Sequence, residues 1–268
     1  QQVAARFGSQ GGGSMDLMWS FPRPDPDADD LVAAGADLRP ETLVAAYAAG
    51  YFPMPLVHSP LDLLRRAGPD APGFGWYSPR HRGVLRPEAL MVSGSLARAT
   101  RRYHLSVNGA FETVIERCGD PARRGHWITA EIVEAYERLH ALGIAHSVEV
   151  WDPDDQLVGG VYGVSLGALF AGESMFHSAR DASKVALVGL VTLLTEERTA
   201  GKMLIDTQWQ TDHLASLGIE EWDRERYLDG LPALTSTNPP DVARWAATPT
   251  EFTQRTRARA TALRSTRR

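Results

Sequence analysis

The chain has 268 residues, a formal charge of −5 and a single cysteine, Cys118. This length suits one large domain or two unequal ones with a buried core. No intrachain disulfide can form, no Cys/His cluster has zinc spacing, and no apolar run approaches the roughly 20 residues of a membrane span. We therefore expect a cytoplasmic monomer that uses neither a metal nor another cofactor.

The small net charge conceals a segregation of arginine. The segment from Leu63 to Trp127 holds eleven arginines against five acids, a balance of +6, and Arg255–Arg268 holds six arginines and no acid. A basic segment on an acidic body is typical of a localised phosphate-contacting surface. A scattered, solvated set of charges explains the same composition about equally well.

The N-terminal third is predicted to form a small domain over residues 15–90. Residues 1–14 end in Gly-Gly-Gly-Ser before Met15 and are interpreted as an added leader. Proline at a first helical turn and glycine just after a last turn delimit a short helix. The expected elements are an irregular segment 21–30, a helix 40–49 stopped by Gly50, and a loop-dominated segment 51–79.

From about residue 91 to 232 the pattern becomes α/β. Alternating apolar residues separated by turn signals predict three antiparallel strands, followed by an apolar helix and another strand. The expected helices are 95–102, 110–117, 129–142, 181–198 (closed near Gly201), 212–217 and 223–228, and the expected strands are 146–151, 156–164, 168–175 and 203–209. This order is that of the acetyltransferase-like (GNAT) fold. Residues 233–268 lose periodicity, and we expect a tail whose arginine-rich end is disordered.

Two polar residues stand out in the strand 203–209, Asp206 and Gln208. A carboxylate buried without partners costs several kcal/mol or shifts its pKa. Side chains two apart in a strand share a face, so the carboxylate and the carboxamide could together polarise a nucleophile. A hydrogen-bonded structural aspartate is an equally weighted alternative.

Eight short motifs in chain order resemble bacterial leucyl/phenylalanyl-tRNA–protein transferases. They are Gly-Tyr-Phe-Pro at 50–53, Trp-Tyr-Ser-Pro at 76–79, Gly-His-Trp-Ile-Thr at 125–129, Ala-His-Ser-Val-Glu-Val-Trp at 145–151, Leu-Val-Gly-Gly-Val-Tyr-Gly-Val at 157–164, Gly-Glu-Ser-Met-Phe at 172–176, Ala-Ser-Lys at 182–184 and Ile-Asp-Thr-Gln at 205–208.

The resemblance implies a GNAT-like C-terminal domain and transfer of Leu, Phe or Met from aminoacyl-tRNA to a protein whose N-terminal residue is Arg or Lys, which marks that protein for degradation. Such aminolysis needs a deprotonated amine, positioned reactants and stabilisation of the carbonyl oxygen. No covalent intermediate is required, so Cys118 is interpreted as structural.

The resemblance also implies the catalytic residues. Asp206 would draw electron density through Gln208, help to remove the amine proton and favour a cationic N-terminal residue. Glu173 matches a position near the reacting groups, with a structural ion pair to Lys184 or an arginine as the alternative.

Binding residues follow in the same way. Val161, Phe170, Leu187 and Leu190 would line the aminoacyl side-chain pocket, although relatives often carry Met at the first position and Phe near the last, and plain core packing is equally plausible. Trp127 and Tyr77 would stack on the 3′ adenosine of the tRNA. From the basic segment, we expect Arg101, Arg102, Arg123 and Arg124 to contact the tRNA backbone.

Three other functions explain the sequence less well. An acyl-CoA-dependent N-acetyltransferase normally has a glycine-rich loop that opens a helix, and the nearest match, Gln156 to Val161, lacks the last glycine and lies in a predicted strand. A peptidoglycan-branching transferase would be longer and lacks these motifs. A non-catalytic tRNA-binding module would not need both Asp206 and Gln208.

Overall fold

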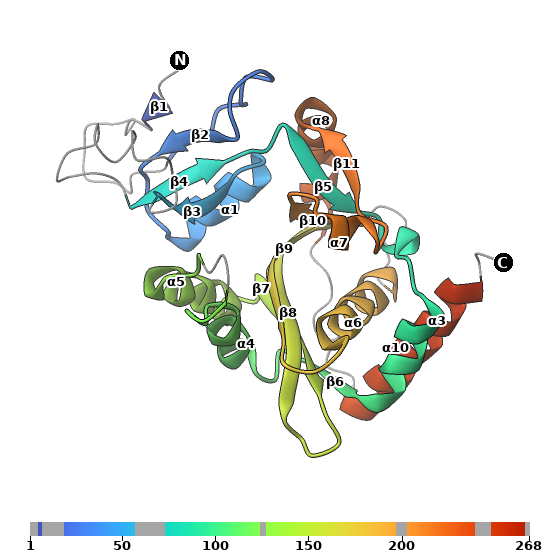
Figure 1. Ribbon diagram of the computed structural model, residues 1–268. Coiled ribbons are helices and arrows are strands. Elements are labelled where there is room, and N and C mark those ends of the chain that lie inside the picture. The colour runs from blue at the N-terminus through green and yellow to red at the C-terminus, as the bar shows by residue number, and fades with distance from the viewer. Residues whose placement is uncertain are drawn as a thin grey trace.

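The computed structural model describes residues 5–6, 19–56, 73–123, 127–196, 203–238 and 248–265. These residues form a mixed α/β structure with a small and a large sheet (Figure 1). The strand order is β1-β2-β4-β3 in the small sheet and β11-β5-β10-β9-β8-β7-β6 in the large one. No helix within the described ranges is both long and apolar enough to cross a membrane.

The small sheet lies near the N-terminus and packs with α1 (Pro40–Ala48), which confirms the predicted helix. Its strands are β1 (Ala5–Arg6), β2 (Leu31–Ala34), β3 (Phe52–Pro55) and β4 (Phe74–Tyr77). The prediction of a loop-dominated segment 51–79 is therefore wrong for β3 and β4. Two prolines concealed β3, which tolerates them because it is an edge strand. The remainder of the predicted leader lies outside the described residues.

The large sheet contains the three predicted antiparallel strands. The predicted strand 203–209 lies beside them and pairs in parallel. Its strands are β5 (His81–Leu85), β6 (His104–Val107), β7 (Ala145–Trp151), β8 (Leu157–Leu166), β9 (Leu169–His177), β10 (Leu204–Gln208) and β11 (Glu220–Asp223). The β7–β9 meander and β10 confirm the prediction, and β10 pairs in parallel with β9. The short strands β5, β6 and β11 were not predicted.

Helices cover both faces of the large sheet, and all three were predicted. On one face lie α4 (Phe111–Cys118) and α5 (Ala130–Ala141), and on the other lies α6 (Ala182–Glu196) (Figure 1). Alternation separates the two cores: Val161 and Phe170 pack on the α6 side, whereas Tyr162 and Ala171 pack on the α4 side. The predicted end of α6 near Gly201 lies outside the described residues.

The shorter helices lie around the sheet. They are α3 (Gly94–Ala99) followed by the 3₁₀ turn Thr100–Arg102, α7 (Asp212–Ala215) and α8 (Arg224–Thr235). The three predicted helical segments are confirmed, and α8 extends seven residues beyond its predicted end at Leu228, with Pro232 inside it.

The prediction of a disordered C-terminal end is wrong for α10 (Pro249–Ser265). Phe252, Thr256, Ala260 and Leu263 recur at helical spacing and are buried against β6 and α6. The backbone N–H of Leu105 in β6 donates to Thr253 Oγ1 at 2.8 Å. The apolar stripe escaped sequence analysis because threonine and alanine occupy half of it, between arginines.

Candidate active site

Asp206 lies on β10, between β5 and β9 in the large sheet, on the face opposite α6, and is fully buried. Its Oδ1 accepts from Arg82 Nε at 2.8 Å and from the Gln208 backbone N–H at 2.9 Å. Its Oδ2 accepts from Arg82 Nη2 at 2.5 Å and from the Tyr227 hydroxyl at 2.8 Å. Both oxygens are thus fully engaged, as a buried carboxylate requires.

Arg82, on β5, is the partner that sequence reasoning missed. Its Nη1 also donates to the Gly50 carbonyl at 3.0 Å, and its guanidinium lies 4.4 Å from the Tyr227 ring centroid and 5.0 Å from that of Phe52. Burial disfavours the charged form, but the Asp206 carboxylate outweighs it and raises the pKa of Arg82 above its ordinary value. In the sequence, the only sign that Arg82 pairs with a buried acid is its place just before the apolar residues Val84 and Leu85.

Glu173, on β9, is the second buried acid of the site. The β8–β9 register shifts between Ser174 and Gly172, so Glu173 lies at a bulge that can re-aim its side chain. It accepts from the Tyr47 hydroxyl at 2.6 Å and the Tyr136 hydroxyl at 3.2 Å, and the two hydroxyls also contact each other. Burial, followed by the charge of Asp206, raises the pKa of Glu173 to about 7 against the hydrogen bonds of the tyrosines.

The alternative for Glu173 was a structural ion pair with Lys184 or an arginine, and among the described residues Glu173 forms neither within 4.0 Å. Lys184 instead lies 3.4 Å from Asp181. Tyr47 and Tyr136, on α1 and α5, were not singled out from the sequence, because tyrosines on a helix face look like ordinary core residues.

Gln208 ends β10 in an unusual backbone geometry. Its φ is +59°, and the β10–β5 register shifts between Asp206 and Gln208. The regular alternation of side chains in β10 therefore ends before Gln208. Its contact with Asp206 is made by the backbone N–H and not by the side chain. The side-chain Nε2 is buried and has no hydrogen-bond partner among the described residues. A buried amide donor without a partner is a candidate for a bond to a ligand.

A pH dependence of stability follows from Glu173. Its pKa is about 7 in the folded protein and 4.5 ordinarily, so the folded state binds more protons between these values and loses stability as pH rises through this window. We expect Glu173→Gln to be more stabilising at pH 8 than at pH 5, by roughly 2–3 kcal/mol. Urea unfolding of both proteins at the two pH values measures this, and an equal difference at both would contradict the assignment.

The four predicted pocket residues are brought together, but on the α6 face. Val161, Phe170, Leu187 and Leu190 are each at most 3% exposed and belong to the core cluster beneath α6. Glu173 and Asp206 belong to the same pair of strands as Phe170. The β9–β10 ladder stops at Ala171–Asp206, and β9 continues beyond it to His177.

Half-buried aromatic rings lie on the small-sheet side of the site. Tyr77 stacks on Phe52 with ring centroids 6.0 Å apart, and Trp209 meets both rings edge-on. Trp127 packs in the same hydrophobic cluster. Trp209, which directly follows Gln208, is a third half-buried aromatic residue that was not predicted as a base platform.

The four predicted tRNA-contacting arginines differ in their surroundings. Arg101 and Arg102 are exposed on the turn after α3. Arg123 is partly buried, and donates to the carbonyls of Cys118 at 2.9 Å and Met175 at 2.8 Å. Its guanidinium is thus anchored to the main chain, and a contact between Arg123 and tRNA stays a prediction. Arg124 lies outside the described residues.

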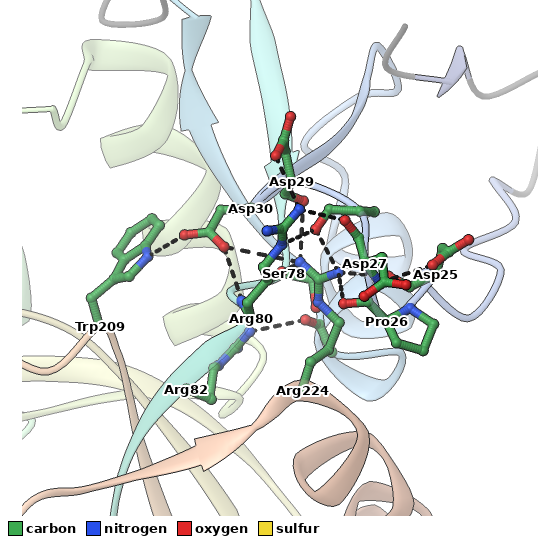
Figure 2. Close-up of polar contacts among 12 residues, drawn as sticks. Asp25, Pro26, Asp27, Asp29, Asp30, Ser78, Arg80, Arg82, Trp209 and Arg224 are labelled. Atoms are coloured by element: carbon green, nitrogen blue, oxygen red, sulfur yellow. Dashed lines mark hydrogen bonds and ion pairs between the residues drawn. The ribbon is translucent and has the colours of Figure 1, made fainter. Parts of the chain in front are cut away.

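Two further arginines hold the proline- and aspartate-rich segment 25–30 beside the site (Figure 2). Arg224 is buried and donates to the carbonyls of Asp25, Ala28, Asp29 and Ser78, and Arg80 donates to those of Asp27 and Ala28. Asp30 accepts from the Trp209 indole at 2.9 Å. The segment is irregular, as predicted. Hydrogen bonds from Arg80 and Arg224 to its main-chain carbonyls hold it in place.

Comparison with known proteins shows which family this chain resembles. The profile described as "Leucyl/phenylalanyl-tRNA protein transferase" matches residues 84–232, and the profile of the corresponding N-terminal domain matches residues 36–61. The leucyl/phenylalanyl-tRNA–protein transferase of Anaeromyxobacter dehalogenans (strain 2CP-C) is 49% identical over 216 residues, which cover 78% of this chain and 85% of that protein.

Two more distant relatives agree. The transferase of the same description from Myxococcus xanthus (strain DK1622) is 45% identical over 79% of this chain and 86% of its own. That of Aeromonas hydrophila subsp. hydrophila is 40% identical over 82% of this chain and 89% of its own. A solved structure described as "The structure of L-PGS from Bacillus licheniformis" covers 84% of this chain and 72% of its own, with 11% identity and a TM-score of 0.30, too low to carry an argument.

Proposed function

Because this chain belongs to the leucyl/phenylalanyl-tRNA–protein transferase family, we propose that it moves leucine, phenylalanine or methionine from charged tRNA onto the N-terminal arginine or lysine of a protein. The observation that carries the proposal is 49% identity over 216 residues to a transferase of that description. Two residues of the site support it. Gln208 has a buried Nε2 without a partner among the described residues, and Glu173 has a pKa of about 7. The acceptor would thereby be marked for degradation.

We further propose that residues 91–232, together with β5, adopt a GNAT-like arrangement, and that the rest of residues 15–90 forms the small domain. The antiparallel β7–β9 meander, the helix α6 and the parallel strand β10 occur in the order of that fold. Charged tRNA as donor implies a cytoplasmic protein, and we propose that it acts as a monomer. Light scattering on a sizing column tests the oligomeric state.

Proton transfer is assigned to Glu173. The α-amine of the acceptor attacks the ester carbonyl, a C–N bond forms, and the C–O bond to the ribose breaks. The amine loses a proton and the ribose hydroxyl gains one. A carboxylate with a pKa of about 7 can take the first proton and return it to the leaving oxygen. The Tyr47 and Tyr136 hydroxyls would hold it in place.

Gln208 is assigned to the carbonyl oxygen. Its buried Nε2 has an unused donor, and such donors stabilise the negative charge that develops during attack. Asp206, already bonded to Arg82 and Tyr227, has no free oxygen with which to take a proton. We therefore assign it the role of holding the strained Gln208 backbone through its Oδ1.

The binding assignments remain those of the sequence. Val161, Phe170, Leu187 and Leu190 would receive the aminoacyl side chain. Tyr77 and Trp127 would stack on the 3′ adenosine, with Trp209 as a third ring in the same region.

Activity is tested directly with purified protein, leucyl-tRNA and a peptide that begins with arginine. We expect a leucine-extended peptide, detected by mass spectrometry, without added CoA, metal or ATP. A peptide beginning with glutamate is the matched control and should not react. Acetylation from acetyl-CoA with no transfer from tRNA would instead favour the N-acetyltransferase reading.

A thiol-based mechanism is a separate possibility, and Cys118 does not suit it. The side chain is buried, and burial raises the pKa of the thiol to about 11, so that it stays protonated at neutral pH. Direct aminolysis needs no such nucleophile.

A further inference from the structure

A tight turn, residues 207–210, carries the chain out of β10 beside the candidate active site. Gln208 in this turn has a φ of +59°, a conformation that residues with a side chain adopt only where surrounding contacts hold them. Gly83 of β5 lies directly against the turn, since a Cβ added to Gly83 would be 2.9 Å from the Gln210 backbone nitrogen. The position of this turn, which we name the Gln208 turn, decides where the Gln208 side chain lies.

Side-chain hydrogen bonds with residues nearby in sequence hold two points of the Gln208 turn. Asp206 Oδ1 accepts from the Gln208 backbone N–H at 2.9 Å. Gln210 Nε2 donates to the carbonyl of Ile219, just before β11, at 2.6 Å. Between these two points the turn has a third attachment, which the Trp209 side chain makes to the N-terminal part of the chain.

Asp30 makes this third attachment. Its Oδ2 accepts from Trp209 Nε1 at 2.9 Å, and a carboxylate is a strong acceptor for such an N–H. Asp30 is itself fixed, because its Oδ1 accepts from the Arg80 backbone N–H at 2.9 Å and its carbonyl accepts from the Ser78 backbone N–H at 2.8 Å (Figure 2). The carboxylate therefore has a defined position although the Asp30 side chain is 40% exposed.

The irregular segment 25–30, which carries Asp30, is held by many hydrogen bonds. The Arg224 side chain is 2% exposed, and it donates to the Ala28 carbonyl at 2.9 Å and to the Asp29 carbonyl at 3.1 Å. Arg80 Nε also donates to the Ala28 carbonyl, at 2.8 Å. Within the described contacts, Asp30 is the residue of this segment whose side chain reaches the Gln208 turn. A rigid segment thus contacts the turn through one carboxylate.

We propose that Asp30 is a positioning residue for the transfer reaction, because its bond to Trp209 sets the place of the Gln208 side-chain amide. This inference rests on the proposed function, in which Gln208 Nε2 donates to the carbonyl oxygen. That nitrogen is buried and has no partner among the described residues, so its place depends on the backbone of the turn. A donor stabilises developing charge efficiently only when it is already in place before the reaction.

A purely structural connection between the segment 25–30 and the large sheet is the alternative role for Asp30. Both roles predict that Asp30→Ala lowers the midpoint of thermal unfolding, because both lose the bond to Trp209. The positioning role alone predicts that the effect of Asp30→Ala on kcat depends on the presence of Gln208. Stability therefore does not separate the two roles, and kinetics does.

The test is a double-mutant cycle in the peptide assay, with kcat measured at saturating leucyl-tRNA. We expect Asp30→Ala to lower kcat on the order of tenfold, because a small displacement of a reacting group is costly. Gln208→Ala alone should lower kcat by roughly 10²–10³, the usual loss for one donor to the carbonyl oxygen. In the Gln208→Ala protein, adding Asp30→Ala should change kcat by less than about twofold, because the group that Asp30 positions is gone.

Two further variants complete the kinetic test. Trp209→Phe keeps an aromatic ring and removes the indole N–H, so Asp30→Ala should lower kcat little further in this background. Asp27→Ala is the matched control. Asp27 is an exposed residue of the same segment, and its side chain accepts no hydrogen bond from another described residue. This variant should keep the wild-type kcat.

A measurement by nuclear magnetic resonance separates this inference from the proposed function. The side-chain amide resonance of Gln208, identified by its absence in Gln208→Ala, should shift in Asp30→Ala and stay in place in Asp27→Ala. If the wild-type protein does not transfer leucine, the proposed function fails. The shift would then still support the placement of Gln208 by Asp30.

Two results would overturn the inference. One is an equal fold-loss of kcat from Asp30→Ala in the wild-type and Gln208→Ala backgrounds, which would show that Asp30 acts independently of Gln208. The other is an unmoved Gln208 amide resonance in Asp30→Ala, which would show that the bond to Trp209 does not set the place of that side chain.

Discussion

Glu173→Gln is expected to lower kcat by roughly 10²–10⁴, the usual contribution of a positioned acid–base group. Glutamine keeps the size of the side chain and an oxygen that accepts from Tyr47 and Tyr136, so the loss reports the proton rather than the packing. The wild-type kcat should rise with pH to a plateau above about 7, where the carboxylate is ionised. The variant should lack that rise.

Glu137→Gln is a suitable control for this experiment. Glu137 lies next to Tyr136 on α5, and its pKa is also raised, by partial burial and by the nearby acids Glu112 and Glu116. The assignment predicts wild-type kcat for this variant. Glu173→Gln with full activity and an unaltered pH profile would remove Glu173 from the proton-transfer step.

Arg82→Met is expected to destabilise the fold by about 3–5 kcal/mol, the cost of leaving a buried charge without its partner. Asp206 is completely buried, and the change leaves it only the Tyr227 hydroxyl and the Gln208 N–H. The free energy of unfolding from denaturant titration measures the loss. Two-state unfolding is the condition for this comparison.

The double variant Arg82→Met/Asp206→Leu separates the charge from the packing. Replacing both partners of a buried ion pair with apolar residues is often nearly neutral, so the double variant should recover most of the stability. Exposed pairs give the opposite reference: removing Arg138, which pairs with Glu134 at 2.7 Å on α5, should cost less than about 1 kcal/mol. Equal losses in the single and double variants would show that shape, not charge, dominates this position.

Local patterns predicted the elements that carry their own signal. The β7–β9 meander has clear alternation and turns, α1 has Pro40 and Gly50 at its ends, and β10 was found from an apolar run around one acid. The edge strands β6 and β11 were missed because four residues carry too little alternation to read. The fold class followed from element order, which short omissions do not disturb.

The site was predicted less completely because its chemistry depends on distant partners. Asp206 was recognised as a buried acid, yet its ion-pair partner, Arg82, lies 124 residues away in the sequence. Likewise the two tyrosines that hold Glu173 come from α1 and α5, and neither lies in a distinctive motif. The backbone at Gln208 departs from strand geometry through a bulge that no residue type announces. The composition showed which segments are rich in arginine. It could not show which arginines donate to main-chain carbonyls, as Arg123 does.

The C-terminal helix has a consequence for the behaviour of the protein in a crowded cell. Strand β6 is the last strand of the large sheet, and its outer edge would otherwise expose unpaired N–H and C=O groups. Thr253 accepts from the Leu105 N–H, and Phe252 and Ala260 are buried where α10 packs on β6 and α6. The helix therefore shields the sheet from edge-to-edge association with another chain. Proteolytic removal of this end would expose the edge of β6, and aggregation is the expected result.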